Sequence, residues 1–304
     1  VVANDLFAAT SLVQDATAIE QLADDTLDCI ATKRSAWAHA SVQAGQSTLA
    51  KLADTYVAAF LAPKVPQGQG QIPLSGYLWS LLHPNANQPP KPELAQAAHD
   101  LCRAHSVFHW WLAFPQVAAK GGFAVMLGNP PWERIKLQEE EFFATRSPLV
   151  AAAKNKAGRA KRIELLRQGL LLHTLYPDVE AAEGLSPPNR AEMRLHEDFI
   201  AARRGAEAAS LYAHDSGRYP LTGVGDVNTY ALFAETFSQL INVGGRAGFI
   251  VQSDIALADS CKAYFASISE GGRVKSLHDF MNLERLFPHI DTRNPRFCLL
   301  TLGS

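Results

Sequence analysis

The spacing of apolar residues predicts that the first third of the chain is helical. Between residues 4 and 62, apolar side chains recur every three or four positions, as they do on one face of a helix. Proline and glycine then interrupt the pattern up to about Pro92. A further helix is expected from Pro92 to about His105, because proline suits the first turn of a helix. Residues 1–105 are therefore expected to be a mainly helical region, and nothing in them indicates its role.

From Val107 onward, short apolar runs alternate with helical patterns. Strands are expected at 123–127, 247–251, 274–280 and 297–302, and helices at 137–173, 189–212, 229–241 and 259–270. Gly244-Gly245 is expected to end the third of these helices as a C-cap. Alternating strands and helices are typical of a mostly parallel sheet covered by helices. The last two strands have no clear helix between them, so they predict a hairpin that adds an antiparallel strand.

Composition narrows the class of protein. The chain has 304 residues, of which 47% are hydrophobic, so it can bury a substantial core. No apolar stretch reaches the roughly 18–20 residues that cross a bilayer, so no membrane partner is expected. The cysteines are too widely spaced for a metal-ligand pattern, and we expect reduced thiols, a cytoplasmic protein and no metal site. The first residues carry no secretory signal and no initiator Met, which suggests a piece of a longer protein.

Basic residues are concentrated in one segment, although the net charge of the chain is −2. Between residues 146 and 167 there is one acid, Glu164, against seven basic residues: Arg146, Lys154, Lys156, Arg159, Lys161, Arg162 and Arg167. Such a run is typical either of a solvated helix face or of a surface that contacts phosphates.

The most informative motif is Asn129-Pro130-Pro131-Trp132, which follows the apolar run 123–128. Neither proline has an N–H to donate, so the run, interpreted as a buried strand, ends there. Open α/β sheets bind ligands at the carboxyl ends of their strands. There the Asn129 side-chain oxygen and the Pro130 carbonyl are two acceptors for the N–H groups of an exocyclic amine, and Trp132 offers a stacking face. The motif predicts a site for a planar amine such as a nucleobase edge, and the alternative is a simple Asn-Pro turn.

Longer blocks around this motif resemble those of one enzyme family. The blocks are Phe108–Trp110, Phe114-Pro115, Gly121–Lys136, Ser216–Pro220, Gly225–Tyr230, Gly244–Val251 and Arg296–Thr301. They are similar to blocks of the large adenine-specific DNA methylases of bacterial restriction and phage-defence systems, the Eco57I-like group. The resemblance implies an α/β fold in which residues 106–304 form the C-terminal half of a Rossmann-like class I methyltransferase sheet. It also implies methyl transfer from S-adenosylmethionine to a flipped adenine in double-stranded DNA, with restriction or defence-system subunits as possible partners.

The family's site residues map onto this sequence as follows. Asn129 and Pro130, with Pro131 in the same motif, would bind the adenine N6 amine, and Trp132 would stack on the base. Asp226 and Asn228 would lie near the cofactor pocket. The residues expected to contact DNA are Arg134, Lys136, Lys154, Lys156, Arg159, Lys161 and Arg162.

Some positions depart from the family pattern. Ala124 stands where the family usually has Asp, and Gln252 stands where it has proline. The glycine-rich turn that holds the methionine part of S-adenosylmethionine has no counterpart, because Gln67–Gly70 and Gly223–Gly225 follow no apolar strand and are interpreted as loops. We therefore expect the isolated chain to bind the cofactor weakly and to be inactive.

Two other functions remain open. The departures are compatible with a catalytically impaired module that binds DNA or protein, and protein glutamine or RNA guanine methyltransferases use similar Asn-Pro-Pro-aromatic turns. His109 and His278 have no partner at ligand spacing, so packed or surface histidines are expected. Ser216-Gly217 and Ser253-Asp254 lack the context of a nucleophile elbow.

Overall fold

The computed structural model describes residues 10–64, 73, 75–83, 90–182, 186–283 and 296–304. They form two compact units, one made of residues 1–133 and 211–304 and the other of residues 134–210. The sequence-based division at 105/106 separates helices from strands inside the first unit. Residues 134–210 form a unit of their own because they have their own core.

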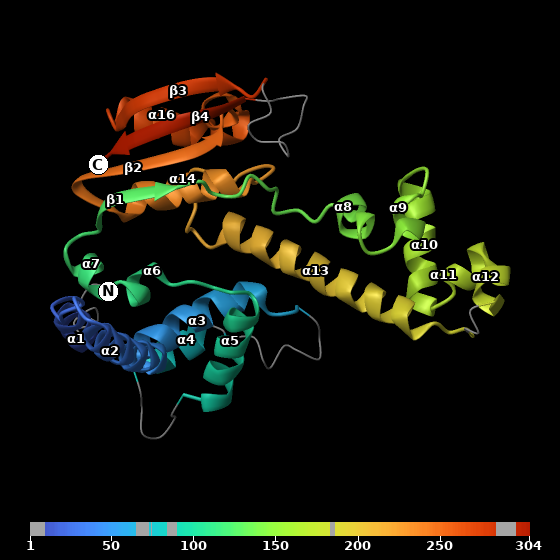
Figure 1. The fold of residues 1–304 in the computed structure, drawn as a ribbon, viewed down its shortest axis with the longest axis horizontal. Helices are drawn as coiled ribbons and strands as arrows, with labels where there is room; N and C mark the ends of the chain where they lie inside the picture. Colours follow the sequence, from blue (N-terminus) through green and yellow to red (C-terminus); the bar gives the residue numbers. More distant parts are fainter. Residues whose placement is uncertain (1–9, 65–72, 74, 84–89, 183–185, 284–295) are drawn as a thin grey trace. The chain divides into compact units, whose positions relative to one another are not determined.

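The front of the first unit is helical, as the spacing predicted (Figure 1). Its helices are α1 (Thr10–Glu20), α2 (Leu27–Gln46), α3 (Thr48–Leu61), α4 (Ser75–Leu82), α5 (Pro92–Ala104), α6 (Trp110–Ala113) and α7 (Pro115–Ala119). Ser47 separates α2 from α3, because its Oγ accepts the Ala50 N–H at 3.1 Å and so caps the second of the two helices. Helices α3 and α5 pack around four buried side chains: Val57, Ala58, Ala98 and Cys102.

The rest of the first unit is a four-stranded mixed sheet with the strand order β1-β2-β4-β3. The strands are β1 (Phe123–Gly128), β2 (Ile241–Gln252), β3 (Val274–Met281) and β4 (Arg296–Gly303). β1 and β2 are parallel, and β4 is antiparallel to both β2 and β3. β3 therefore runs in the same direction as β1 and β2. This confirms the mixed α/β fold and the pairing of the last two strands.

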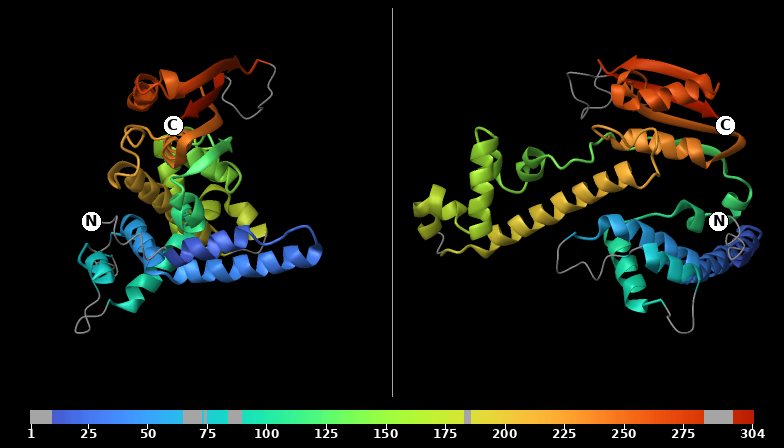
Figure 2. Two further views of the ribbon diagram at one scale, coloured as in Figure 1. Left: turned by 90° about the vertical axis from the view of Figure 1, so that its left-hand side faces the viewer. Right: turned by 180° about the vertical axis from the view of Figure 1, so that it is seen from behind.

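Helices cover one face of the sheet (Figures 1 and 2). The sequence between β1 and β2 ends in α14 (Thr229–Leu240), and α15 (Asp254–Leu257), the 3₁₀ turn Asp259–Cys261 and α16 (Lys262–Glu270) lie between β2 and β3. The hydroxyl oxygens of Ser238 and Tyr264 are 2.8 Å apart, so they join α14 to α16. The side chains buried under these helices include Met126, Ala247, Phe249, Val251, Cys298, Leu300 and Leu302. Alternate residues of β2 and β4 thus form most of the sheet's part of the core.

The expectation that the strand 123–127 is buried is wrong for the described chain. Met126 faces the helices, but Val125 and Leu127 are 59% and 77% exposed. They point to the opposite face, because successive side chains of a strand alternate. The apolar run indicated a strand correctly, but it could not indicate whether both faces of that strand are covered.

The predicted C-cap at Gly244-Gly245 is also wrong, because these glycines lie inside β2. α14 ends at Leu240 and the strand starts at Ile241. Phe123 pairs with Ile241, whereas Val125 pairs with Arg246, so β2 carries extra residues at this point. A Cβ on Gly245 would lie 2.8 Å from the Phe123 carbonyl oxygen, which leaves no room for a side chain. The glycines mark an irregularity in strand pairing.

The second unit is helical. Its elements are α8 (Glu139–Ala144), α9 (Pro148–Ala151), α10 (Lys156–Gln168), α11 (Leu171–Leu175), α12 (Pro177–Ala182) and the first part of α13 (Arg190–Asp215). Asn155 caps the start of α10, and Gly169 ends it with a positive φ of 67°. The core contains Phe142, Phe143, Val150, Leu166, Leu171 and Phe199. In the parts of the chain that the structure describes, no helix combines the length and apolar character needed to cross a bilayer.

Candidate site at the end of strand β1

The Asn129–Trp132 turn begins directly after Gly128, the last residue of β1. A Cβ on Gly128 would lie 3.1 Å from the Phe237 ring of α14. Phe237 is itself buried in the core, so it has little room to move. Glycine therefore lets the strand end rest on α14, and the buried ring of Pro130 continues this contact with the interior.

Thr229, at the start of α14, fixes the far side of the turn. Its Oγ1 donates to the Pro131 carbonyl oxygen at 2.7 Å and accepts the Glu133 N–H at 3.1 Å. Its own N–H donates to the Glu133 carbonyl oxygen at 2.9 Å. The turn thus spans a strand end and a helix start, both of which are well packed. Sequence reasoning did not identify Thr229, although its place after a helix-capping asparagine is a usable signal.

Trp132 is half-buried and packs against the core of the sheet. Its Nε1–H donates to the Ile250 carbonyl oxygen of β2 at 3.3 Å. Its ring lies on Phe297, with the ring centres 6.4 Å apart, and Phe297 in turn stacks on Phe280 at 5.3 Å. Trp132 is therefore the first ring of a row of three at the carboxyl ends of β1 and β3.

Asn129 differs from its neighbours because its side chain is exposed. Within the described residues, neither its amide nor the Pro130 carbonyl takes part in a hydrogen bond. The two groups are adjacent in the chain, on a turn held at both ends. Asn129 thus presents an exposed acceptor, and the carbonyl of the buried Pro130 is a second acceptor beside it in the chain.

Polar residues that sequence reasoning missed lie at the same edge of the sheet. Because β1, β2 and β3 run in one direction, their carboxyl ends meet there. Ser253, directly after β2, is buried and its hydroxyl donates to the Asp279 carboxylate of β3. Arg296 at the start of β4 lies 3.8 Å from the same carboxylate. This network joins β2, β3 and β4, and it explains Ser253 as a structural residue.

Asn228, one of the two proposed cofactor residues, lies at the turn. Asn228 caps α14, since its Oδ1 accepts the Tyr230 N–H at 3.3 Å, and its Nδ2 lies 3.5 Å from the Trp132 carbonyl oxygen. Asp226 is exposed in the loop before it. Asn228 thus has a clear positioning role in the turn.

The Gly223–Gly225 segment, interpreted as a loop, is packed at Gly223, whereas Val224 and Gly225 are exposed. A Cβ on Gly223 would lie 2.2 Å from the Ala213 carbonyl oxygen of α13, and its own carbonyl oxygen is 2.7 Å from His214 Nδ1. The buried Glu235 of α14 also binds the preceding residues Leu221 and Thr222. Gly223 is therefore required for the close approach of the loop to α13. The other candidate, Gln67–Gly70, lies outside the described residues.

The proposed DNA-contacting residues belong to the second unit, where they divide into two groups. Arg159 is buried between Glu139 and Glu140, at 3.1 and 2.8 Å, and the Arg162 guanidinium donates to the Leu149 carbonyl. Arg146 and Arg167, also in the basic run, contact Phe142 and Glu164. The exposed cations are Arg134, Lys136, Lys154, Lys156 and Lys161. Arg159 and Arg162 therefore help to hold the unit together, because Glu139, Glu140 and the Leu149 carbonyl bind their guanidinium groups.

Cysteines and histidines were expected to be packed or at the surface. Burial raises the pKa of Cys102 and Cys298 to about 12, so both are protonated thiols near neutral pH. His278 is exposed on β3. His109 does have a partner, contrary to expectation, since its Nε2 lies 2.8 Å from Asp54 Oδ1. The two residues are far apart in sequence, so spacing could not reveal the pair.

Replacing Thr229 with Val is expected to loosen the turn. The variant loses the bond to Pro131 and the acceptor for the Glu133 N–H, and we expect the free energy of unfolding to fall by about 1–2 kcal/mol. The Glu133 amide should exchange its hydrogen about ten times faster. Hydrogen exchange measured by NMR checks this, with Thr229→Ser as the control that retains the hydroxyl. An unchanged exchange rate at Glu133 would show that Thr229 does not hold the turn.

Three comparisons with known proteins found no relative, so the functional proposal below rests on the residues of the site. No protein-family model, curated protein or solved structure matches the chain.

Proposed function

We propose that this chain carries the base-binding part of a site-specific DNA methyltransferase that modifies adenine at N6, in a restriction-modification or phage-defence system. The observation that carries the proposal is the pair of acceptors at Asn129 and Pro130. They stand on a rigid turn at the carboxyl end of a parallel strand, and no described residue donates a hydrogen bond to them. Ligands of open α/β sheets bind at this edge.

The chemistry of the acceptors fits an exocyclic amine. The amine lone pair of adenine is delocalised into the ring, which makes the nitrogen a poor nucleophile. Two acceptors that bind both N–H groups favour a pyramidal nitrogen, whose lone pair is then available for attack. This contribution depends on preorganised positions, which the contacts of Gly128, Thr229 and Trp132 provide. No general base is needed before attack, because the proton can leave after transfer.

S-adenosylmethionine would supply the electrophilic methyl group. The two segments considered for it are engaged in the fold, because Asn228 caps a helix and Gly223 is packed against α13. We therefore assign to this chain the orientation of the amine and the stacking of the base, and no part in holding the cofactor.

Three lysines of the second unit are proposed to contact DNA phosphates. Lys154, Lys156 and Lys161 are exposed, unlike the arginines beside them. Replacing all three with Gln should lower the slope of log affinity against log salt by about 3, since each phosphate contact contributes roughly 0.9. Fluorescence anisotropy with a labelled duplex at several salt concentrations measures this.

The matched control changes three exposed lysines of the first unit, Lys51, Lys91 and Lys262, to Gln. The salt slope of the control should stay within experimental error of the wild type. If both triple variants lower the salt slope equally, the lysines of the second unit contact DNA no more than other exposed lysines do. The proposal for Lys154, Lys156 and Lys161 then fails.

Mapping of modified adenines tests the proposed function as a whole. Cells that carry the natural gene should show N6-methyladenine at one short sequence by long-read sequencing, and a deletion strain should lose it. The absence of any adenine mark that depends on the gene would reject the proposal.

A second candidate is a methyltransferase-like module that binds DNA or protein without catalysis. The observation in its favour is Trp132, whose ring already lies on Phe297 and whose N–H is bonded to Ile250. A ring held in this way has less freedom to adapt to a base. DNA binding by the natural protein with no gene-dependent methylation would favour this candidate.

A further inference from the structure

The helices of the first unit enclose a cavity that the proposed function does not use. It has a volume of about 490 Å³ and is lined by residues of α1, α2, α3, α5, α6 and α7 and the segments that connect them. No residue of the 129–133 turn contributes to it. Its size lies within the range of small-molecule sites, roughly 300–1,000 Å³, and far exceeds that of a single ion.

One wall of the cavity holds a buried carboxylate between two imidazoles. Asp54 of α3 is 8% exposed, and its Oδ1 and Oδ2 lie 2.8 Å from His109 Nε2 and 2.9 Å from His99 Nδ1. Burial raises the pKa of Asp54, but the hydrogen bonds from His109 and His99 lower it more, so the net pKa is below its ordinary value. Both carboxylate oxygens are thus engaged within the protein.

The imidazoles also offer hydrogen-bonding groups to a ligand. Each ring donates one N–H to Asp54, so the second nitrogens, His99 Nε2 and His109 Nδ1, are acceptors. Arg103 lies one turn after His99 on α5 and also lines the cavity. Its guanidinium is always charged and suits a carboxylate or another planar anion. Arg103 is therefore the group on this wall that favours a negative charge on a ligand.

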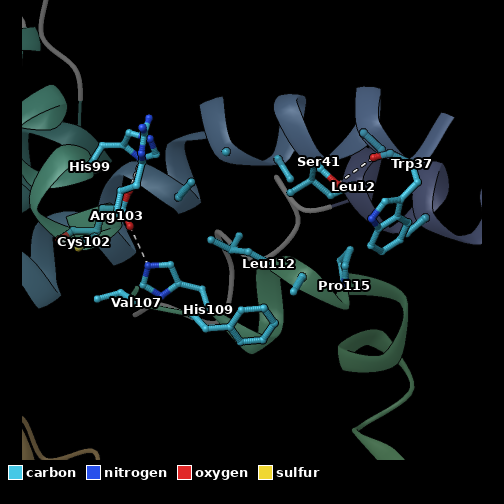
Figure 3. Close-up of a pocket in the computed structure, with 18 of the residues that line it drawn as sticks. Leu12, Trp37, Ser41, His99, Cys102, Arg103, Val107, His109, Leu112 and Pro115 are labelled. Carbon is cyan, nitrogen blue, oxygen red and sulfur yellow. Dashed lines mark hydrogen bonds and ion pairs between the residues drawn. The ribbon is translucent and has the colours of Figure 1, made fainter. Parts of the chain in front are cut away.

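The opposite side of the cavity is apolar and aromatic. Figure 3 shows Leu12, Trp37 and Ser41 on this side, across from His99 and Arg103. Trp37 on this side is 43% exposed, an unusual state for a large aromatic side chain, and Phe108, which precedes His109 in the chain, also lines the cavity and is 56% exposed. Asp15 lies one turn from Leu12 on α1, so this acid belongs to the side away from Arg103.

We propose that the cavity binds a small aromatic molecule that carries a carboxylate or a similar anionic group. The anion lies against Arg103, an N–H or O–H of the ligand is accepted by a second imidazole nitrogen, and the ring lies against Trp37. The arrangement pairs a few convergent polar groups with an apolar wall, as small-molecule sites do. This site is independent of the Asn129 turn and of the methyltransferase proposal.

Isothermal titration of the chain with two probes of equal shape and opposite charge tests the proposal. We expect 2-naphthoate to bind at one site per chain with a Kd below about 1 mM, and 2-naphthylmethylammonium to bind at least about ten times more weakly. Arg103→Gln should remove the preference for the anionic probe. Trp37→Ala should weaken the binding of both probes. Trp37 and Arg103 are exposed, so both variants are expected to fold, which circular dichroism checks.

Trp79→Ala is the matched control, since Trp79 is exposed on α4 and does not line the cavity. It should leave both affinities unchanged. The proposal is overturned if naphthoate does not bind at 5 mM, if the ammonium probe binds more tightly, or if Trp79→Ala weakens binding as much as Trp37→Ala does.

Discussion

Replacing Glu235 with Ala is expected to lower the free energy of unfolding by about 3–5 kcal/mol. Glu235 lies on α14 and is only 1% exposed. Its carboxylate accepts the Thr222 N–H at 2.9 Å, the Thr222 hydroxyl at 2.6 Å and the Leu221 N–H at 3.3 Å. The variant leaves these donors without an acceptor, and it opens a cavity under the loop that leads to α14. Urea titration followed by circular dichroism measures the loss.

Two further variants show whether the hydrogen bonds of the Glu235 carboxylate account for the loss of unfolding free energy. Glu235→Gln retains the shape but offers one oxygen, so it should lose about 1–2 kcal/mol. Glu207→Ala removes an exposed acid of α13 that lies 3.8 Å from Arg203, and should change the free energy of unfolding by less than about 0.5 kcal/mol. Equal losses in Glu235→Ala and Glu207→Ala would contradict the account of the loop.

Replacing Asn129 with Ala is expected to lower kcat for adenine methylation by about 10²–10³-fold in the natural protein. The variant removes one of the two acceptors for the amine and leaves the Pro130 carbonyl. KM for DNA should change little, because phosphate contacts supply most of the affinity. Asn129 is exposed and has no hydrogen bond to the described residues, so stability should be unaffected.

Asn129→Asp separates the acceptor role from a general effect of substitution. A carboxylate oxygen accepts a hydrogen bond as an amide oxygen does. We therefore expect this variant to retain at least ten times more activity than Asn129→Ala, although its added charge faces the DNA. If the two variants are equally inactive, the side chain does more than accept a hydrogen bond.

The parts of the fold that sequence predicted correctly are those set by local pattern. The strands at 123–128 and 296–303 follow from their apolar runs, and α5 follows from Pro92 and its periodicity. The turn after Gly128 was found for the same reason, since two adjacent prolines must end a strand. Exposure of Val125 and Leu127 was missed, because it depends on which other elements cover the strand.

The features that sequence could not predict depend on distant partners. Asp54 meets His99 and His109 across 45 and 55 residues, so the polar wall of the cavity has no local signature. Gly244-Gly245 resembles a helix C-cap in sequence but accommodates the close approach of Phe123. Arg159 was expected to contact DNA but is buried, because its acid partners Glu139 and Glu140 lie outside the basic run.

The most direct test of the central claim is to identify the atom that receives the methyl group. The purified natural protein is incubated with duplex DNA and S-adenosylmethionine labelled in its methyl group. The DNA is then digested to nucleosides, which are separated and identified by mass spectrometry. The account predicts that the label appears in N6-methyldeoxyadenosine and falls at least about a hundredfold with Asn129→Ala. Label found only in protein glutamine or RNA guanine, or DNA that is bound but never methylated, would contradict it.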